Sequence, residues 1–363
     1  MDAAEFAPPR CPKRSCPMHE QPAGRFWYRD GHYVARCHPA PVPRYVCKIC
    51  DGKFSAQTFR HSYRDRRPDA NDPLFRMLTS GVGLRQTGRN LCLDICSVVH
   101  KMRKIARTCA LLHELMASKL TASTYLLDEE ESYETASIRP LTMPVLIEKD
   151  TWFVVATAVG SIRRLAREGS RRRARQDAEE AAQGERRDES AEVVRQVLEQ
   201  LRGKVGDRPV TLRTDEKSSY ATIAKAVFGE RLVHETTPGR APRTTRNPLF
   251  AINTTMAMTR DNCGRLRRRS WLVSKQGSAL AAHLHVFTVY RNYVRRRFNY
   301  DEPSASSATF LGILPRVLET AEVLRWRQDW GDLSSHPTSR DGQTNYRQFA
   351  AARAADTTPS LTL

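Results

Sequence analysis

Cysteines gathered near one end of the chain are the side chains best suited to hold a metal ion. Of nine cysteines, five fall within the first 50 residues. Two close pairs, Cys11-x4-Cys16 and Cys47-x2-Cys50, would give zinc the tetrahedral four-thiolate cage of its structural sites. The alternative to a zinc site is two buried thiol pairs without a metal. So small an apolar core would hardly fold without a metal ion or another cross-link. Three nearby side chains could replace a member of the first pair: His19, Cys37 and His38.

Two aspartates follow apolar runs and could serve a different, catalytic metal. Asp128 ends a run that begins at Tyr125, and Asp215 comes just after the short run 210–212. If the two runs are neighbouring strands, as the first and fourth strands of a ribonuclease-H-like sheet are, the carboxylates converge. Such a pair can hold two Mg²⁺ ions about 3.5–4 Å apart, which suits phosphoryl displacement. Taken singly, each aspartate is more often a turn residue, so the prediction depends on its surroundings.

The overall charge points to a polyanionic partner. The 363 residues carry 59 Lys and Arg against 40 Asp and Glu, a formal net charge of +19. Nucleic acid is the favoured partner, because each cation set against a phosphate releases condensed counterions. No apolar stretch approaches the length of a transmembrane span, and the start of the chain lacks the apolar core of a signal peptide. We therefore expect no membrane partner and a reducing, cytoplasmic location in which cysteines stay thiols or bind metal.

The elements that must position these residues change in kind along the chain. Prolines, aromatics and cysteine pairs predict a short β-rich module, after which helical periodicity and a glycine turn predict a helix-turn-helix. Alternating strand-like and helical runs then predict an α/β domain. The expected boundaries are 1–10 for a disordered start, 11–60 for the zinc module, 72–120 for the helix-turn-helix, 123–300 for the α/β domain, 163–190 for a charged insertion within it, and 331–363 for a disordered tail.

The third helix of segment 72–120 carries a basic face that could reach phosphates and major-groove edges. Arg85 and Arg89 on the preceding helix would add phosphate clamps. The alternative to DNA contact is a solvated basic helix that packs on the next domain. The adjacent cysteine module and the net charge favour DNA contact. The basic face consists of His100, Lys101, Arg103, Lys104 and Arg107.

Three blocks of sequence support one reading of these features. They are, in chain order, Arg44–Cys50 with Phe54–Phe59, Asp128–Glu134 with Arg139–Val145, and Asn247–Asn253 with Arg265–Trp271 and Ser274-Lys275. In this order they resemble the zinc ribbon, the first catalytic block and the last catalytic helix of insertion-sequence transposases related to the first-named bacterial insertion element. The resemblance covers about residues 11–300. Each block alone is a moderately specific sign of the family, and three blocks in the right order are much stronger evidence for the resemblance.

The resemblance implies a recombinase of the DDE type, in which three residues hold Mg²⁺ or Mn²⁺. Asp128 and Asp215 would occupy the first two positions, and the third, commonly Glu, falls on Asn253. Asn offers a neutral oxygen to the metal and cannot act as a base. With Asn at this position, the chain could be either an active enzyme or an inactivated copy of one. Glu131 and Glu134 are the candidates to supply the missing charge.

Basic side chains near the presumed catalytic helix would contact phosphates. Arg260 lies seven residues after Asn253 on the same helical face, and an ordinary solvated arginine is the alternative. His234 looks like a position near the active site of the family. The segment after the helix adds Arg265, Arg267, Arg268, Arg269 and Lys275.

Together these observations predict an α/β ribonuclease-H-like nuclease domain preceded by a small zinc ribbon and an α-helical helix-turn-helix domain. The expected protein is a nucleoid-associated prokaryotic transposase that binds double-stranded DNA at element ends and target, as a homodimer or higher assembly. A catalytically inactive, transposase-derived DNA-binding protein or regulator is the main alternative. An RNA-binding zinc protein is weaker, because no aromatic platform of the usual RNA modules is visible.

Overall fold

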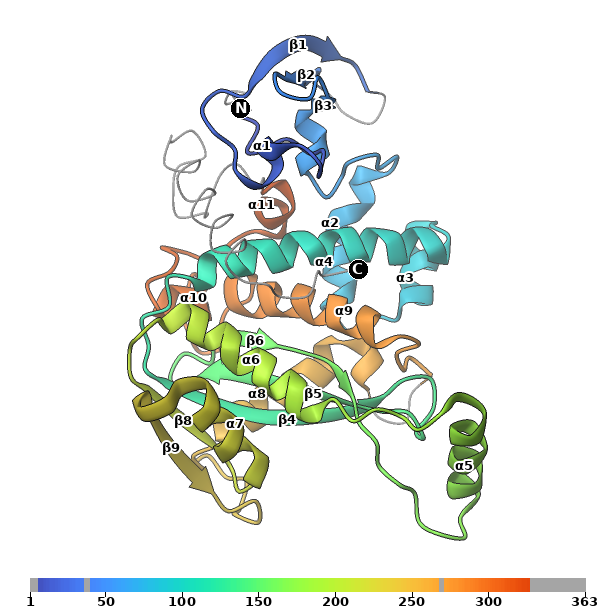
Figure 1. Ribbon diagram of the computed structural model, residues 1–363, viewed down its shortest axis with the longest axis vertical. Coiled ribbons are helices and arrows are strands. Elements are labelled where there is room, and N and C mark those ends of the chain that lie inside the picture. Colours follow the sequence, from blue (N-terminus) through green and yellow to red (C-terminus); the bar gives the residue numbers. More distant parts are fainter. Residues whose placement is uncertain (1–5, 36–39, 268–270, 327–363) are drawn as a thin grey trace.

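The computed structural model describes residues 6–35, 40–267 and 271–326. Within these ranges a small β-rich module precedes a larger body that combines helices with a mixed sheet (Figure 1). The expected α/β class with a separate N-terminal module is therefore confirmed at this level. Part of the sequence predictions fall outside the described residues: the tail 331–363, the alternative ligands Cys37 and His38, and the basic residues Arg268 and Arg269.

The N-terminal module is an antiparallel sheet of three strands in the order β1-β2-β3, within the part of the chain described. Tyr45 on the central strand pairs in register with Arg29 and with Phe54. A short helix precedes the sheet and two 3₁₀ turns follow it. The bounds are α1 (Pro17–Glu20), β1 (Trp27–Tyr33), β2 (Val42–Cys47), β3 (Lys53–Ser55), η1 (Ala56–Phe59) and η2 (Pro68–Ala70).

The predicted disorder of residues 1–10 is wrong for Phe6, the first described position. Its side chain is 3% exposed and lies against the rings of Tyr45 and Phe59, with centroids 5.4 and 5.6 Å apart. The Tyr45 hydroxyl also donates to the Phe6 carbonyl at 3.1 Å. A module with so few apolar residues recruits this aromatic from the chain before the first cysteine, because each ring adds a large buried area.

Three helices follow in the segment predicted to be a helix-turn-helix. Asp94 caps the longest of them, because its carboxylate accepts the backbone N–H groups of Cys96 and Ser97 at 3.2 and 3.1 Å. Gly81 lies in the turn before the second helix with φ +72°, a conformation that favours glycine. The helices are α2 (Asn71–Leu78), α3 (Leu84–Leu91) and α4 (Ile95–Ala117).

Helix α4 is a core element of the larger body. Its apolar positions recur at spacings of three and four, and packing against α9 (Gly277–Val289) buries them. One hydrophobic core runs from α2 through α4 to the sheet and the final helices. His113 of α4 joins these parts through polar contacts, to the Tyr293 hydroxyl at 2.9 Å and the Val155 carbonyl at 3.0 Å. The helical segment and the α/β segment therefore share one core.

The mixed sheet has six strands in the described residues, with the order β6-β5-β4-β8-β9 and β7 paired to β5. Strand β4 runs antiparallel to β5 and parallel to β8, which is parallel to β9. The expected neighbouring placement of the strands that carry Asp128 and Asp215 is confirmed. The bounds are β4 (Thr124–Tyr133), β5 (Pro140–Glu148), β6 (Val154–Thr157), β7 (Gly160–Ser161), β8 (Val210–Asp215) and β9 (Leu232–Thr237).

Helices cover both faces of this sheet (Figure 1). Helices α6 and α7 pack on the face that presents Tyr125 and Leu127, and α8 packs on the face that presents Leu126. Helix α5 projects beside the sheet. The bounds are α5 (Arg171–Gln183), α6 (Ser190–Val205), α7 (Ser218–Phe228), η3 (Gly229–Arg231), α8 (Phe250–Asn262), η4 (Gly264–Leu266), η5 (Tyr290–Val294, a π-helical turn), α10 (Ser307–Phe310) and α11 (Thr320–Arg325).

Candidate metal centres and nucleic-acid interface

The four predicted cysteines come together in the N-terminal module. The sulfur atoms of Cys11, Cys16, Cys47 and Cys50 all lie within 4.8 Å of one another. Cys11 and Cys50 are 3.6 Å apart, and Cys16 and Cys47 are 3.8 Å apart. Four thiolates at about 2.3 Å from a tetrahedral zinc would be separated by about 3.8 Å. The cluster therefore has the dimensions of a structural zinc site.

Backbone turns hold the cysteines at these distances. The N–H of Cys11 donates to the Met18 carbonyl at 2.9 Å, and the N–H of Asp51 donates to the Cys47 carbonyl at 2.9 Å. His19 is not a ligand in this arrangement, since its Nδ1 lies 2.7 Å from the Cys11 carbonyl oxygen.

The thiols are electrostatically suited to a cation. Burial raises the pKa of Cys11 and Cys16, so each thiolate is costly without a positive charge. Burial acts in the same direction on Cys50, but the Gly52 N–H and the neighbouring thiols outweigh it and the pKa is lowered. Bound Zn²⁺ would offset the desolvation of all four thiolates.

Strand β4 carries Asp128 onto the face of the sheet that α8 covers. Successive side chains of a strand point to opposite faces. Tyr125 therefore faces the core under α6 and α7, while Leu126 and Asp128 face α8. On β8, Leu212 pairs in register with Tyr125 and shares its core, which puts Asp215 on the same face as Asp128.

The two aspartates stand side by side on neighbouring strands. The last registered pair of β4 and β8 is Leu126 with Arg213, and Asp128 and Asp215 come two residues later on each strand. The sequence suggested that Asp128 ends its strand. In the structure it lies in the middle of β4. The strand continues because β5 pairs with it as far as Tyr133. The two carboxylates nevertheless lie on one face, at corresponding positions of neighbouring strands.

The ionised form of Asp128 is unfavourable in the absence of a nearby cation. Burial raises the pKa of Asp128 to about 6, and the negative charges of Asp215 and Glu129 add to the effect. The Glu129 N–H, which donates to Asp128 Oδ1 at 2.7 Å, and the Arg243 guanidinium oppose it. Asp215 Oδ1 accepts the N–H of Lys217 at 3.1 Å. Two carboxylate groups so placed are suitable ligands for a divalent ion.

Helix α8 brings Asn253 to the acid-bearing face. Asn253 lies on its first turn and is half-buried, and its side chain forms no hydrogen bond to the described residues. The predicted phosphate contact by Arg260 is in conflict with the structure, because its guanidinium forms an ion pair with Glu130 of β4. The Glu130 side chain is 1% exposed, so a buried carboxylate holds this arginine.

The two glutamates expected to supply a third charge lie elsewhere. Glu131 points to the opposite face of β4 and pairs with Arg164. Glu134 accepts the Gly277 N–H at 2.8 Å, at the start of α9. His234 lies on β9 with Nε2 2.9 Å from the Thr214 hydroxyl, beside the strand that carries Asp215.

Several residues predicted to bind DNA are engaged within the protein. Lys101 is buried and pairs with Asp65 at 2.6 Å, which removes it from any outer surface. Lys104 donates to the Tyr63 carbonyl, and Arg103 donates to Gln276 Oε1 at 3.0 Å. The basic spacing on α4 instead fastens the linker 60–70 to the helical layer. The prediction that Lys101 reads DNA is therefore wrong.

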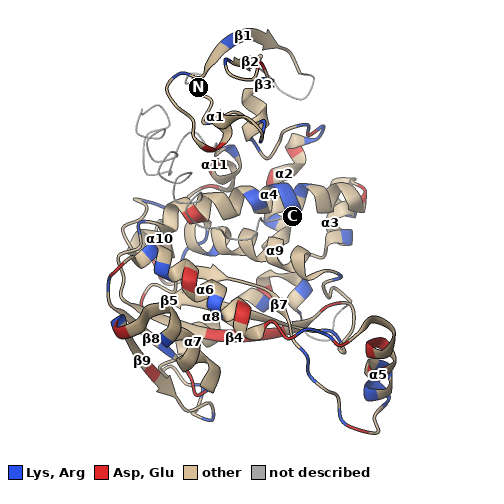
Figure 2. Ribbon diagram, in the orientation of Figure 1, with Lys and Arg blue, Asp and Glu red and all other residues tan. Residues whose placement is uncertain are grey.

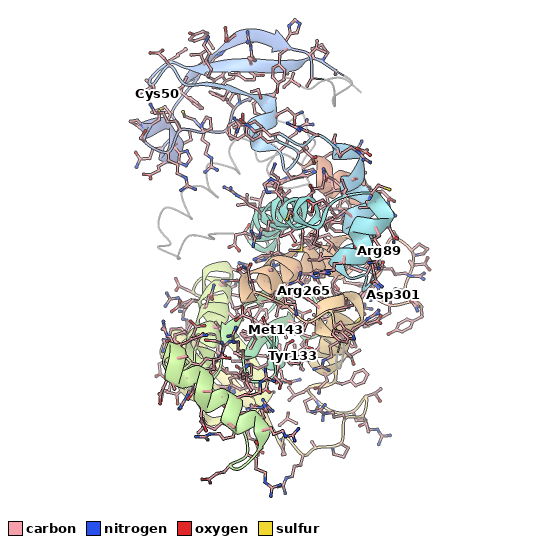
Figure 3. The ribbon with its side chains drawn as sticks, turned by 90° about the vertical axis from the view of Figure 1, so that its right-hand side faces the viewer. Cys50, Arg89, Tyr133, Met143, Arg265 and Asp301 are labelled. Carbon is pink, nitrogen blue, oxygen red and sulfur yellow. The ribbon has the colours of Figure 1, made fainter. Side chains whose placement is uncertain are left out.

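Arg265 is a second correction, because it is 7% exposed and donates to His283 Nδ1 at 3.1 Å. Figure 3 shows Arg265 within the body and Arg89 at its margin on α3. Burial lowers the pKa of Arg265 to about 10. The predicted DNA-binding residues that remain exposed are Arg85, Arg89, His100, Arg107, Arg267 and Lys275.

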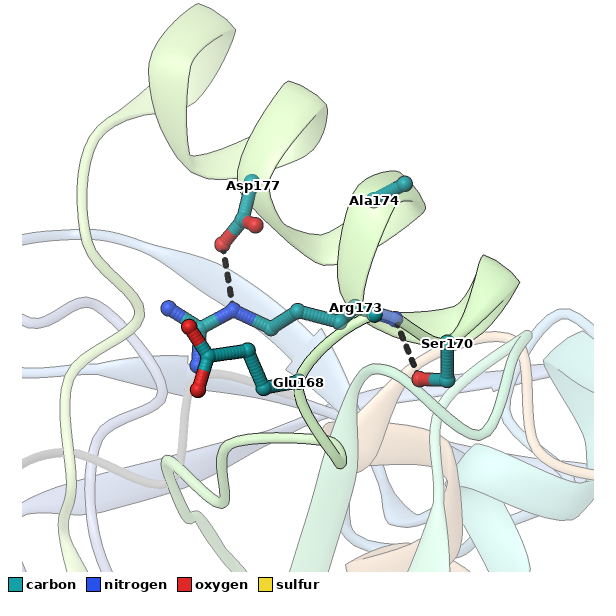
Figure 4. Close-up of a pocket in the computed structure, with 6 residues that line it drawn as sticks. Glu168, Ser170, Arg173, Ala174 and Asp177 are labelled. Carbon is teal, nitrogen blue, oxygen red and sulfur yellow. Dashed lines mark hydrogen bonds and ion pairs between the residues drawn. The ribbon is translucent and has the colours of Figure 1, made fainter.

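The charged insertion neutralises much of its own charge. Figure 2 shows Lys and Arg interleaved with Asp and Glu along α5. A shallow open pocket of about 500 Å³ lies at the start of this helix, where Arg173 pairs with Asp177 at 2.7 Å and its N–H donates to Ser170 (Figure 4). Arg163 likewise pairs with Glu180 at 2.9 Å. Acids and arginines of the insertion therefore pair with one another.

Comparison with models of protein families and with curated proteins finds no match to this chain. Among the described helices, none has both the length and the apolar character that a membrane crossing requires. Function must therefore be inferred from the cysteine cluster, the acid pair and the exposed basic residues.

Proposed function

We propose that the chain is a transposase that binds the ends of a mobile element and catalyses metal-dependent cleavage and transfer of DNA strands. The observation that carries the proposal is the pair Asp128 and Asp215, adjacent on parallel strands and facing the helix that bears Asn253. The parallel pairing of β4 and β8 also supports a ribonuclease-H-like fold for this body. The net charge of +19 suits a DNA partner.

Asp128, Asp215 and Asn253 would hold Mg²⁺ or Mn²⁺. When bound, such ions would supply activation of the attacking oxygen and stabilisation of the leaving oxygen. The protein's own contribution is to place the two carboxylates on corresponding positions of neighbouring strands and to shield Asp128 partly from water. The cysteine module, with structural zinc, and α3, with Arg85 and Arg89, would bind the terminal repeats. Joining two ends requires a dimer or a larger assembly.

A catalytically inactive, transposase-derived DNA-binding protein is the second candidate, and one observation favours it. Among the described residues, the cysteine cluster is the only group of three or more His, Cys, Asp or Glu side chains that could share a metal ion. In the described part of the chain, no third carboxylate completes a metal site with the acid pair: Glu130 pairs with Arg260, and Glu131 pairs with Arg164. Asn253 would have to suffice as the third ligand.

The deciding experiment is cleavage of end-labelled duplexes taken from the DNA on either side of the coding sequence, in Mg²⁺ and in Mn²⁺. Wild type is compared with Asp215→Ala and Asn253→Glu, and with Glu199→Gln, an exposed residue of α6 away from the acid pair, as the control. Metal-dependent nicking that is lost only in Asp215→Ala establishes the nuclease and shows that Asn253 suffices. Binding without cleavage, with cleavage gained in Asn253→Glu, favours the inactive copy. Absence of DNA binding by the wild type contradicts both candidates.

A further inference from the structure

The loop 238–249, which joins β9 to α8, carries three arginines at a regular spacing. Arg240, Arg243 and Arg246 are all exposed, and none forms an ion pair or hydrogen bond with the described part of the chain. This sets them apart from nearby arginines: Arg213 pairs with Glu235 at 2.6 Å, and Arg260 pairs with Glu130. Three positive charges therefore remain without an internal partner at one edge of the sheet.

Hydrogen bonds within the loop give it a defined shape. Its first turn closes through the Ala241 N–H, which donates to the Pro238 carbonyl at 2.8 Å. Its second turn closes through the N–H of Asn247, which donates to the Thr244 carbonyl at 3.0 Å. The Asn247 side chain then braces both ends, donating to the Pro242 carbonyl at 2.9 Å and accepting the Leu249 N–H at 2.8 Å. The loop presents its arginines from a braced backbone.

The loop borders the acid pair. An open pocket of about 360 Å³ lies between the end of β8 and the start of the loop. The positive charge of Arg243 also reaches Asp128, where it lowers the pKa against the stronger, raising effect of burial. The pocket is lined by Asp215, Glu216, Lys217, Pro238, Gly239 and Arg240.

We propose that loop 238–249 is a phosphate-binding loop that holds the backbone of a DNA duplex beside Asp128 and Asp215. The proposal rests on the function proposed above and adds a binding surface to it. Residues three apart in a chain are separated by at most about 10 Å, so the three arginines can reach only a short run of phosphates along one strand. Guanidinium groups pair with phosphate oxygens in a bidentate manner, and these have no internal carboxylate to displace first.

The test measures binding of the zinc-loaded full chain to a fluorescein-labelled duplex of 30 base pairs, by anisotropy, in Ca²⁺ and over a range of salt concentrations. The variant is Arg240→Gln with Arg243→Gln and Arg246→Gln. The matched control removes the same charge from other exposed arginines, through Arg171→Gln, Arg195→Gln and Arg202→Gln. Circular dichroism verifies that both variants are folded.

We expect the loop variant to bind about 10–100-fold more weakly near 0.15 M salt, with the slope of log affinity against log salt reduced by about 2–3. The control should keep the wild-type slope within about 1. Equal slopes for wild type and loop variant would overturn the inference while leaving DNA binding, and with it the proposed function, intact. An equal loss in the control would also overturn it, because the effect would then be one of net charge. If the wild type binds no duplex, both the inference and the proposed function fail.

Discussion

Asp128→Asn should stabilise the protein at neutral pH while abolishing its proposed activity. Burial and the neighbouring carboxylates raise the pKa of Asp128 to about 6 from its ordinary 3.8. Because the folded pKa lies above the unfolded one, this group favours folding below about pH 4, and that contribution is lost as the pH rises through 6. Each pKa unit corresponds to about 1.4 kcal/mol, so the ionised carboxylate costs at most about 3 kcal/mol at pH 7.5.

Partial solvent access reduces this ceiling, and we expect a gain of about 1–2 kcal/mol for Asp128→Asn in the absence of Mg²⁺. Asparagine keeps an oxygen for the Glu129 N–H, so little else is lost. Urea unfolding at pH 7.5 and pH 4 measures the effect, with Glu216→Gln as the control. The gain should vanish at pH 4 and shrink when Mg²⁺ is added, since ions stabilise only the wild type. A variant that is neutral or less stable at pH 7.5 would refute the conclusion that the ionised Asp128 carboxylate destabilises the fold.

Three further changes test other parts of the structure. Cys47→Ser should abolish binding of one equivalent of zinc and the cooperative folding of the N-terminal module, measured by metal analysis and circular dichroism; retained zinc would contradict the four-thiolate cage. Lys101→Met should cost about 3–5 kcal/mol in urea unfolding, because it leaves a buried carboxylate unpaired, and a loss below 1 kcal/mol would argue against that pair. Gly264→Ala should lower the unfolding temperature, since its Cβ would lie 2.5 Å from the Gly81 carbonyl oxygen, at a cost of about 1–3 kcal/mol. Gly203→Ala, on a helix with nothing within 4 Å of the new Cβ, is the control and should gain up to about 1 kcal/mol.

The parts of the fold that could be predicted from sequence are those that local patterns determine. Cysteine spacing predicted which four thiols lie together, since four thiols in two pairs have few other arrangements in so small a module. The apolar run before Asp128 and the one before Asp215 predicted two strands, and their parallel pairing agrees with the expected sheet order. Asp94 was recognisable as a helix cap because its position before an apolar-periodic run is typical of one.

The roles of basic residues could not be predicted in the same way. Whether Lys101 faces DNA or the interior depends on Asp65, which lies 36 positions away in sequence. Arg260 meets its partner Glu130 only because α8 crosses the face of β4. A spacing of three would suit one face of a helix, but Pro238, Pro242 and Pro248 interrupt the segment, so its sequence does not show that the loop arginines share a surface. Arg243 nevertheless lies between two turns that a run of Pro, Gly and Thr could have suggested.

The shared core of α4, α9 and the sheet limits how the protein can be re-engineered. A segment that recognises DNA is often regarded as a cassette that can be exchanged between relatives. Here residues 71–117 contribute one side of the core on which the acid-bearing sheet is built. A chimera that replaced them would also need a matching α9, and a fragment cut after residue 120 would expose the apolar face of α4 to water. The proposed DNA preference should therefore be changed by substitutions on exposed surfaces such as α3, not by exchange of the segment.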